Sequence, residues 1–231
     1  MAGETLRVEV KHAHPGFTLD VAFDAPPGFT VLFGPSGAGK STTLGAIAGL
    51  VRPDAGTITL GQDVWLDRAR GVEVPAWRRG IAYVFQGLAL FPHLSAQHNV
   101  EYGIDREVPR AERRARATAM LERMKVGHLA RRRPASFSGG EAQRVALARA
   151  FARAPRVVLL DEPFSAMDRD LARDLCADAR RVVAELGVPG LLVTHHRNKA
   201  RLLGDRAVLI ERGRVVGAGS LDELLEPRED R

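Results

Sequence analysis

The fold of this chain is decided by the stretch Phe29-Thr-Val-Leu-Phe33, which is followed at once by Gly34-Pro-Ser-Gly-Ala-Gly-Lys40-Ser41. The apolar run predicts a buried strand, and residues 40–50 have the apolar spacing of a helix. The pattern G-x-x-x-x-G-K-[ST] between a strand and a helix predicts a phosphate-binding loop, because glycines let backbone N–H groups converge on phosphate oxygens at the positive end of the helix. The residues expected to bind the phosphates are Gly34, Pro35, Ser36, Gly37, Ala38, Gly39, Lys40, Ser41 and Thr42.

Two residues of this loop have specific expected roles. Lys40 would reach the β- and γ-phosphates of a nucleotide, and the hydroxyl of Ser41 would bind Mg²⁺.

A second apolar run, at 157–160, ends in the adjacent carboxylates Asp161 and Glu162. In open α/β sheets ligands bind at the carboxyl ends of strands, so both acids are expected beside the phosphate-binding loop. Asp161 is the candidate metal residue for Mg²⁺, and Glu162 is the candidate catalytic base that polarises the attacking water. Because neighbouring side chains on a strand point to opposite faces, the chain has to turn here, and Pro163 favours a turn.

The rest of the chain alternates between strand and helix patterns around a long helical stretch. Strands are predicted at 5–10, 17–23, 57–60, 81–85, 190–194, 206–211 and 214–217, and helices at 170–186, 197–203 and after Ser220. Residues 87–100 have loop character, whereas 110–153 are expected to form three helical pieces broken at Gly127 and at 133–140. Apolar strands alternating with helices predict an α/β fold with a buried, mostly parallel sheet and a helical insertion.

Positive charge is concentrated in the helical stretch. Residues 106–156 contain 14 Arg and Lys against 4 Asp and Glu, a surplus of +10, whereas the whole chain carries +6. Such a surplus is typical of a solvated face, and an anionic partner would also require it. Charge alone does not separate these two interpretations.

Composition excludes several classes of protein. With 45% hydrophobic residues the chain can bury a core, so intrinsic disorder is excluded. No apolar run approaches the ~18 residues that a membrane span needs, and the first residues lack the pattern of a signal peptide. The single cysteine, Cys176, excludes an internal disulfide and a multi-cysteine metal site, which suits a reducing cytoplasm.

Further motifs follow in a fixed order: Gln86, then FSGGEAQR at 137–144, LLDEP at 159–163, SAMD at 165–168 and VTHH at 193–196. Together with the phosphate-binding loop, this series resembles the nucleotide-binding subunit of ATP-binding-cassette (ABC) transporters over essentially the whole chain. The resemblance implies a P-loop NTPase core with a mostly parallel sheet, an antiparallel β subdomain near the N-terminus and an inserted all-helical subdomain. We expect one ABC ATPase domain over 1–231, with its α/β core at 1–86 and 154–231 and its helical subdomain at 87–153.

The resemblance also implies the roles of single residues around ATP and Mg²⁺. Gln86 would sense Mg²⁺ and the attacking water, and His195 would hydrogen-bond the γ-phosphate. An aromatic residue that stacks on adenine is expected shortly before the loop, with Phe17 as the first candidate and His14 as the second. His196 stands where an acid is common in the family, so the charge around His195 departs from the usual pattern.

Two copies of the chain would form a head-to-tail dimer that depends on ATP. The resemblance implies that Ser138, Gly139 and Gly140 bind the γ-phosphate held by the second copy, and that Asp168 connects the two sites across the dimer. Neither site would then be complete in one chain.

Residues 84–103 are similar to importer subunits, particularly those for molybdate, sulfate or iron. Phe91 and Leu94 are candidates for the pocket that receives a helix of the membrane permease, and a place in the hydrophobic core explains them equally well. We expect an ATP-hydrolysing subunit at the cytoplasmic face of the cell membrane, working with permease subunits and, indirectly, with an extracytoplasmic solute-binding protein. No C-terminal regulatory domain is expected, since the chain stops at Arg231.

The alternative is a soluble ATPase of the same superfamily that acts on nucleic acid, which the basic stretch would suit. Only 98 positions separate Lys40 from Ser138, whereas such relatives usually carry large insertions, so no nucleic-acid partner is expected. A non-enzymatic nucleotide sensor would lack Glu162 or His195, and both are present.

Overall fold

One mixed sheet organises the chain in the computed structural model, which describes residues 3–14, 16–164, 167 and 169–225. Within these residues the sheet has 11 strands in the order β6-β5-β4-β1-β2-β11-β10-β3-β9-β8-β7. The strands are β1 (Leu6–His14), β2 (Phe17–Ala25), β3 (Gly28–Phe33), β4 (Ala55–Leu60), β5 (Asp63–Asp67), β6 (Val72–Glu73), β7 (Ile81–Val84), β8 (Val157–Asp161), β9 (Pro189–Val193), β10 (Arg206–Glu211) and β11 (Arg214–Ser220).

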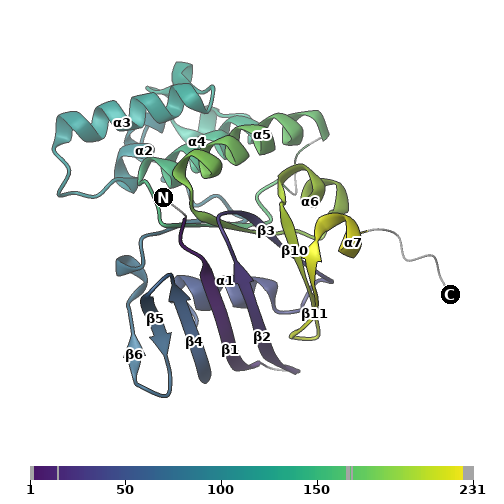
Figure 1. Cartoon of the computed structure of the whole chain (residues 1–231). Helices are drawn as coiled ribbons and strands as arrows, with labels where there is room; N and C mark the ends of the chain where they lie inside the picture. The colour runs from purple at the N-terminus through teal and green to yellow at the C-terminus, as the bar shows by residue number, and fades with distance from the viewer. Residues whose placement is uncertain (1–2, 15, 165–166, 168, 226–231) are drawn as a thin grey trace.

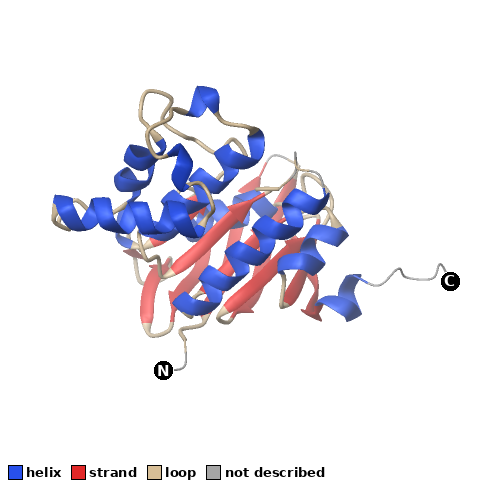
Figure 2. Cartoon of the chain, turned by 90° about the horizontal axis from the view of Figure 1, so that it is seen from above, coloured by secondary structure: helices blue, strands red, loops and turns tan. Residues whose placement is uncertain are grey.

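Helices cover both faces of this sheet. They are α1 (Lys40–Ala48), α2 (Ala96–Gly103), α3 (Arg110–Arg123), α4 (Gly139–Ala152), α5 (Arg169–Leu186), α6 (Arg197–Leu203) and α7 (Leu221–Leu225), with short 3-10 turns at Ala76–Arg78, Gly127–Leu129 and Pro134–Ser136. Figure 1 shows α2, α3 and α4 gathered at the end of the molecule opposite the tips of β4, β5 and β6. Seen from above in Figure 2, helices lie across the strands over much of their length.

The strands β10, β3, β9, β8 and β7 form the parallel part of the sheet. Every residue of β9 is buried, as expected for a strand that is covered on both faces. The register places Leu32 of β3 beside Val193 of β9, and Val193 beside Asp161 of β8. The carboxyl ends of these strands therefore meet at one edge of the sheet, which brings together the segments that follow β3, β8 and β9.

The strands β6, β5, β4, β1 and β2 pair antiparallel and lie on the other side of the sheet. The strand β11 joins the two parts, because it pairs antiparallel with β10 and parallel with β2. This arrangement confirms the predicted fold class, with parallel core strands and antiparallel strands near the N-terminus.

Two hydrophobic clusters lie on opposite faces of the parallel strands. Val157 and Leu159 of β8 face the cluster that contains α1 and the antiparallel strands. Val158 and Leu160 face the cluster that contains α2, α3, α4, α5 and α6. This alternation follows from the two-residue period of a strand, so β8 is held from both sides just before its terminal carboxylate.

The prediction of a loop over 87–100 is wrong at the end of this range, where α2 begins. Ser95 caps this helix by accepting the N–H of His98 at 3.3 Å. Asn99 is fully buried, and its side-chain amide donates to three carbonyls of the preceding segment. The helix has only 8 residues and depends on this buried amide, so apolar periodicity alone did not reveal it.

The three helical pieces predicted within 110–153 are two in the structure. The chain leaves α3 through Lys125, which has a left-handed backbone (φ 61), and the expected middle piece is only a 3-10 turn. The second helix, α4, already begins at Gly139.

Two strands, β5 and β6, were not predicted, because the buried residues Trp65 and Leu66 are adjacent instead of alternating. No helix in the described ranges is long and apolar enough to cross a membrane.

Candidate nucleotide-binding site

The loop between β3 and α1 has a backbone that only glycine allows at two positions. Gly34 (φ 151) passes so close to β10 that a Cβ atom there would lie 2.0 Å from the carbonyl oxygen of Ile210. Gly39 (φ 99) is the N-cap residue of α1 and provides no side-chain cap. The positive end of α1 is therefore presented to the loop without a side chain over it, which suits an anion.

Lys40 lies inside this loop and is only 7% exposed. Its ammonium group donates to the carbonyl oxygens of Gly34 at 2.9 Å and Pro35 at 2.7 Å. Burial lowers the pKa of Lys40, and the nearby carboxylates of Glu162 and Asp161 oppose that shift. The loop and the two carboxylates thus form one electrostatic unit, as the sequence predicted.

Two hydroxyl groups hold Asp161 at the end of β8. The Ser41 hydroxyl donates to Oδ1 at 3.0 Å, and the Tyr83 hydroxyl donates to Oδ2 at 3.3 Å. Burial raises the pKa of Asp161, while these hydrogen bonds oppose the rise. A serine hydroxyl next to a carboxylate offers the hard oxygen donors that Mg²⁺ prefers, so the residues present fit this ion.

Glu162 makes the turn that both carboxylates require. It has a left-handed backbone (φ 47), and its N–H donates to the carbonyl of Val193 at 3.0 Å. Its Oε1 accepts the N–H of His195 at 3.0 Å and lies 2.6 Å from Nδ1 of the same residue. A non-glycine residue held in this backbone region is typical of a functional position. Glu162 and His195 are therefore joined at the edge that carries the phosphate-binding loop.

The residue after His195 changes the surroundings of that histidine. The rings of His195 and His196 lie 3.9 Å apart between centroids. Burial lowers the pKa of His196, and the neighbouring His195 and Lys199 lower it further. At the position where the resemblance leads us to expect an acid, this chain thus carries an imidazole ring whose protonated form is disfavoured by its surroundings.

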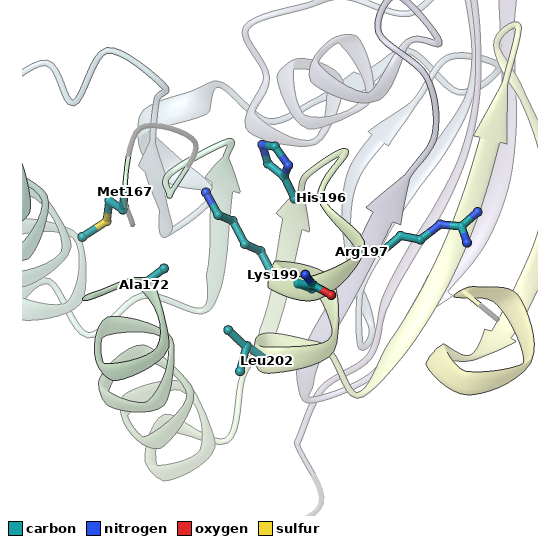
Figure 3. Close-up of a pocket in the computed structure, with 7 residues that line it drawn as sticks. Met167, Ala172, His196, Arg197, Lys199 and Leu202 are labelled. Atoms are coloured by element: carbon teal, nitrogen blue, oxygen red, sulfur yellow. The ribbon is translucent and has the colours of Figure 1, made fainter. Parts of the chain in front are cut away.

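Beyond His196, a cavity of about 300 Å³ separates α6 from the start of α5 (Figure 3). Figure 3 shows Lys199 extending from α6 toward the segment that carries Met167, whereas Arg197 points away from it. The ammonium group of Lys199 donates to the carbonyl of Phe164. This contact ties α6 to the segment just after Glu162. Among the described residues, Ala172, Asn198 and Leu202 also line this cavity.

Gln86 lies two residues beyond β7. The register pairs Val84 of β7 with Leu160 of β8, so Gln86 and Glu162 leave neighbouring strands at the same edge. Gln86 is exposed, and its side chain makes no hydrogen bond within the described part of the chain. The structure therefore brings Gln86 to the site without joining it to Asp161.

Phe17, the first candidate for adenine stacking, lies beside the phosphate-binding loop. A cavity of about 140 Å³ is lined by Phe17 together with Gly37, Gly39, Lys40, Ser41 and Thr42. A Cβ atom on Gly39 would lie 3.2 Å from the Phe17 ring, so this glycine permits the close approach. The side chain of His14, the second candidate, lies outside the described part.

Ser138 and Gly140 are separate from that cavity. Ser138 caps α4: its Oγ accepts the N–H of Glu141 at 3.3 Å, and its own N–H donates to Glu141 Oε2 at 2.8 Å. Gly139 is exposed at the first position of α4, and Gly140 packs against Leu171 of α5. None of residues 138–140 is among the described residues lining the phosphate-loop cavity. Asp168 lies outside the described residues.

Tyr83 is the residue of this site that sequence reasoning missed. It stands three positions before Gln86 on β7, its ring stacks on Phe85 at 4.1 Å, and its hydroxyl reaches Asp161. Burial raises the pKa of Tyr83, and the charge of Asp161 raises it further, so the phenol stays protonated as a donor. The available signal was a tyrosine within an apolar strand, because a buried phenol usually has a hydrogen-bond partner.

Comparisons with known proteins show the family of the chain. The family model described as ABC transporter matches residues 19–165. The chain is 40% identical to the molybdenum import ATP-binding protein ModC 1 of Azotobacter vinelandii, over 97% of this chain and 62% of that protein. It is 44% identical to the molybdate/tungstate import ATP-binding protein WtpC of Archaeoglobus fulgidus, over 96% of this chain and 90% of that protein. The chain thus spans about three fifths of the ModC relatives' length.

Solved structures show the same fold. The structure of cbiO1 from Clostridium perfringens, part of the ABC transporter complex cbiONQ, matches with a TM-score of 0.84 at 26% identity, covering 95% of this chain and 89% of that one. The dimeric structure of MJ0796, a bacterial ABC transporter cassette, matches with a TM-score of 0.78 at 30% identity, covering 94% and 98%. Because the family model matches residues 19–165 and WtpC is 44% identical over 96% of this chain, the chain belongs to the ABC transporter family.

Proposed function

We propose that this chain is the ATP-hydrolysing motor subunit of a membrane ABC importer. The observation that carries the proposal is the meeting of three groups of residues at one sheet edge: Lys40 in the loop, Ser41 bonded to Asp161, and Glu162 in contact with His195. A binding module that only senses nucleotide would need the first two groups but not the last. The pair of Glu162 and His195 is what hydrolysis requires.

In the proposed reaction, water attacks the γ-phosphorus of ATP in line with the bond that breaks to ADP. Glu162 accepts a proton from that water, and His195 holds the Glu162 carboxylate and a γ-phosphate oxygen. Lys40 and the N–H groups at the start of α1 bind the β- and γ-phosphates. Ser41, Asp161 and Gln86 would hold Mg²⁺, which neutralises phosphate charge when bound. Phe17 would stack on the adenine.

The catalytic unit in this proposal is a dimer. Ser138, Gly139 and Gly140 do not line the phosphate-loop cavity of their own chain, which supports a role at the ATP of a second copy. The dimeric ABC cassette that this chain resembles supports the same arrangement. Asp168 would link the two sites.

The proposed cargo is molybdate or a related oxyanion. This proposal rests on the printed names of the ModC and WtpC relatives, which are import ATP-binding proteins for molybdenum and for molybdate or tungstate. The chain would act at the cytoplasmic face of the cell membrane on permease subunits, with an extracytoplasmic solute-binding protein supplying the ion. A groove lined by Phe91, Tyr102 and Arg149 beside β7 is the proposed seat of a permease helix.

The test uses Glu162→Gln in the full chain. We expect ATP hydrolysis to fall by at least ~100-fold, because a positioned base contributes 10²–10⁴. ATP binding should persist, and the variant should elute as a dimer with ATP and as a monomer without it. The matched control is Glu211→Gln, an exposed glutamate at the end of β10. Undiminished hydrolysis by Glu162→Gln would contradict the assigned base.

A further inference from the structure

The proposed function uses Arg149 of the basic helical stretch and leaves the arginines near α3 without a role, and some of these line a further cavity. This cavity, of about 490 Å³, lies between α2 and α3, which are neighbours in Figure 1. Three arginines border it: Arg110 and Arg114 from α3, and Arg131 from the segment that precedes α4. Its volume suits a small organic molecule more than a single ion.

The arginines of α3 divide into two groups. Arg113 donates to the carbonyls of residues 106 and 108, Arg116 pairs with Glu112, and Arg123 pairs with Glu185. Arg110 and Arg114 make no such contact with any described side chain or carbonyl, and the same holds for Arg131. The three guanidinium groups that border the cavity therefore have N–H donors available to bind a ligand.

The charge of the cavity favours an anion. Glu101 is the only carboxylate among the described residues that line it, and its Oε1 accepts a hydrogen bond from Gln97 Nε2 at 2.9 Å. Three guanidinium groups against one carboxylate leave a formal charge of +2 with His98 neutral. Arg110 is also the first residue of α3, where the helix dipole disfavours a cation; the acidic residue of this turn, Glu112, is paired with Arg116.

The wall of the cavity is fixed and polar. Gln97 Nε2 also donates to the carbonyl of Arg114 at 3.0 Å, and the hydroxyl of Thr118 donates to Gln97 Oε1 at 3.2 Å. The N–H of Gln97 donates to the carbonyl of Ala130 at 3.0 Å, which holds the segment carrying Arg131 against α2. These bonds orient α2, α3 and this segment around the cavity without using the three guanidinium groups.

From these observations we propose that the cavity between α2 and α3 binds a small polar molecule that carries a phosphate or a similar tetrahedral oxyanion. Arg110, Arg114 and Arg131 would bind the oxyanion, because a guanidinium fork matches the geometry of phosphate oxygens. Ser95 and Thr118 also line the cavity and give its wall a polar character. The site is separate from the phosphate-binding loop and does not depend on hydrolysis.

The test is equilibrium binding of inorganic phosphate to the Lys40→Ala protein, in which the phosphate-binding loop is disabled, at constant ionic strength. We expect saturable binding of one phosphate per chain, weakened about tenfold or more by Arg114→Ala combined with Arg131→Ala. The matched control, Arg106→Ala with Arg133→Ala, removes two exposed arginines of the same stretch that do not line the cavity. It should leave binding unchanged, and melting curves of all variants verify folding.

Two outcomes would overturn the proposal: the absence of saturable binding, or equal weakening by both double variants, which would show diffuse charge instead of a site. A second arm identifies the source of the oxyanion with vesicles of phosphatidylglycerol and of phosphatidylcholine. Binding to the former that Arg114→Ala with Arg131→Ala abolishes would assign the cavity to a lipid headgroup. Phosphate binding without vesicle binding would assign it to a soluble phosphate.

Discussion

The two helix N-termini that would meet ATP in the proposed dimer are built in different ways. At the start of α1, Gly39 provides no side-chain cap, and Ser41 turns away to Asp161 on β8. At the start of α4, Ser138 and Glu141 cap the helix reciprocally within four residues. The N-terminus of α1 therefore has no side-chain cap of its own and is open to a ligand beside the sheet. The N-terminus of α4, in contrast, is capped by residues of the same turn.

This difference teaches which part of the chain should respond to nucleotide. The loop before α1 holds a buried ammonium group at the positive end of the helix, so the phosphates of a nucleotide add favourable charge there, and Mg²⁺ would offset the two nearby carboxylates. The cap of α4 gains nothing comparable within one chain. Nucleotide should stabilise a single chain through α1, and the state of α4 should matter for the dimer.

Lys40→Ala tests the first half of this comparison and has the largest expected effect. A ligand at 100 times its dissociation constant stabilises the folded protein by about 2.7 kcal/mol, and this gain should disappear in the variant. The measurement is the melting temperature with and without ATP and Mg²⁺. Ser138→Ala is the control, since in a single chain it should keep the full rise.

Asp161→Asn should separate stability from activity. Burial raises the pKa of Asp161, so its ionised form costs folding free energy above the ordinary pKa of Asp, and removing the charge should raise the melting temperature in EDTA. Hydrolysis should fall by at least ~100-fold, because the variant loses a Mg²⁺ ligand. Calorimetry and a phosphate-release assay measure the two effects.

Asp178→Asn is the matched control for that result. Burial alone would raise the pKa of Asp178, but hydrogen bonds from Arg144 and Lys125 hold it below its ordinary value. The sign is thus reversed, and this variant should melt at a lower temperature than the unchanged protein. If Asp161→Asn and Asp178→Asn changed the melting temperature in the same direction, the balance assigned here between burial and hydrogen-bond partners would be contradicted.

Ser138→Ala tests the second half of the comparison. Loss of the cap should cost about 1 kcal/mol of stability without nucleotide. Hydrolysis should be lost as well, if Ser138 serves the ATP of a second copy. Ser220→Ala removes the equivalent cap from α7, where Glu223 donates its N–H to Ser220 at 3.3 Å. That control should lower stability and leave hydrolysis unchanged.

The cap of α4 should depend on pH through the charge of Glu141, and Glu141→Gln should remove that dependence. Hydrogen bonds from the backbone and hydroxyl of Ser138, and from His128, lower the pKa of Glu141. A lowered pKa contributes stability above the unfolded value of about 4.3, and this contribution is lost as pH falls through the folded value. The unchanged protein should therefore melt above the variant at pH 7, and the difference should close in acid. A constant difference from pH 7 to pH 3 would show that the charge of Glu141 is irrelevant.

Sequence reasoning predicted the features that are encoded within short stretches of the chain. The phosphate-binding loop and the pair Asp161 and Glu162 are each encoded within a few consecutive residues, and the fold class followed from apolar strands between helices. The hydrogen bond from Tyr83 to Asp161 joins residues 78 positions apart, so no local pattern predicts it. Helix α2 was missed for a different reason: it depends on the buried amide of Asn99, and apolar periodicity does not detect a buried polar side chain.

Tyr83→Phe sharpens the comparison with the smallest expected effect. The variant keeps the ring that stacks on Phe85 and removes only the hydroxyl that holds Oδ2 of Asp161. A single hydrogen bond of this kind contributes roughly 1 kcal/mol, so the Mg²⁺ concentration for half-maximal hydrolysis should rise about two- to fivefold. The rate at saturating Mg²⁺ should change little, because Glu162 and His195 are untouched. Tyr102→Phe, at the other tyrosine of the chain, should leave the Mg²⁺ dependence unchanged. If both variants have the same Mg²⁺ dependence, the Tyr83 hydroxyl does not support the Mg²⁺ site and Tyr83 only packs in the sheet. Ser41 would then be the residue whose hydrogen bond orients Asp161.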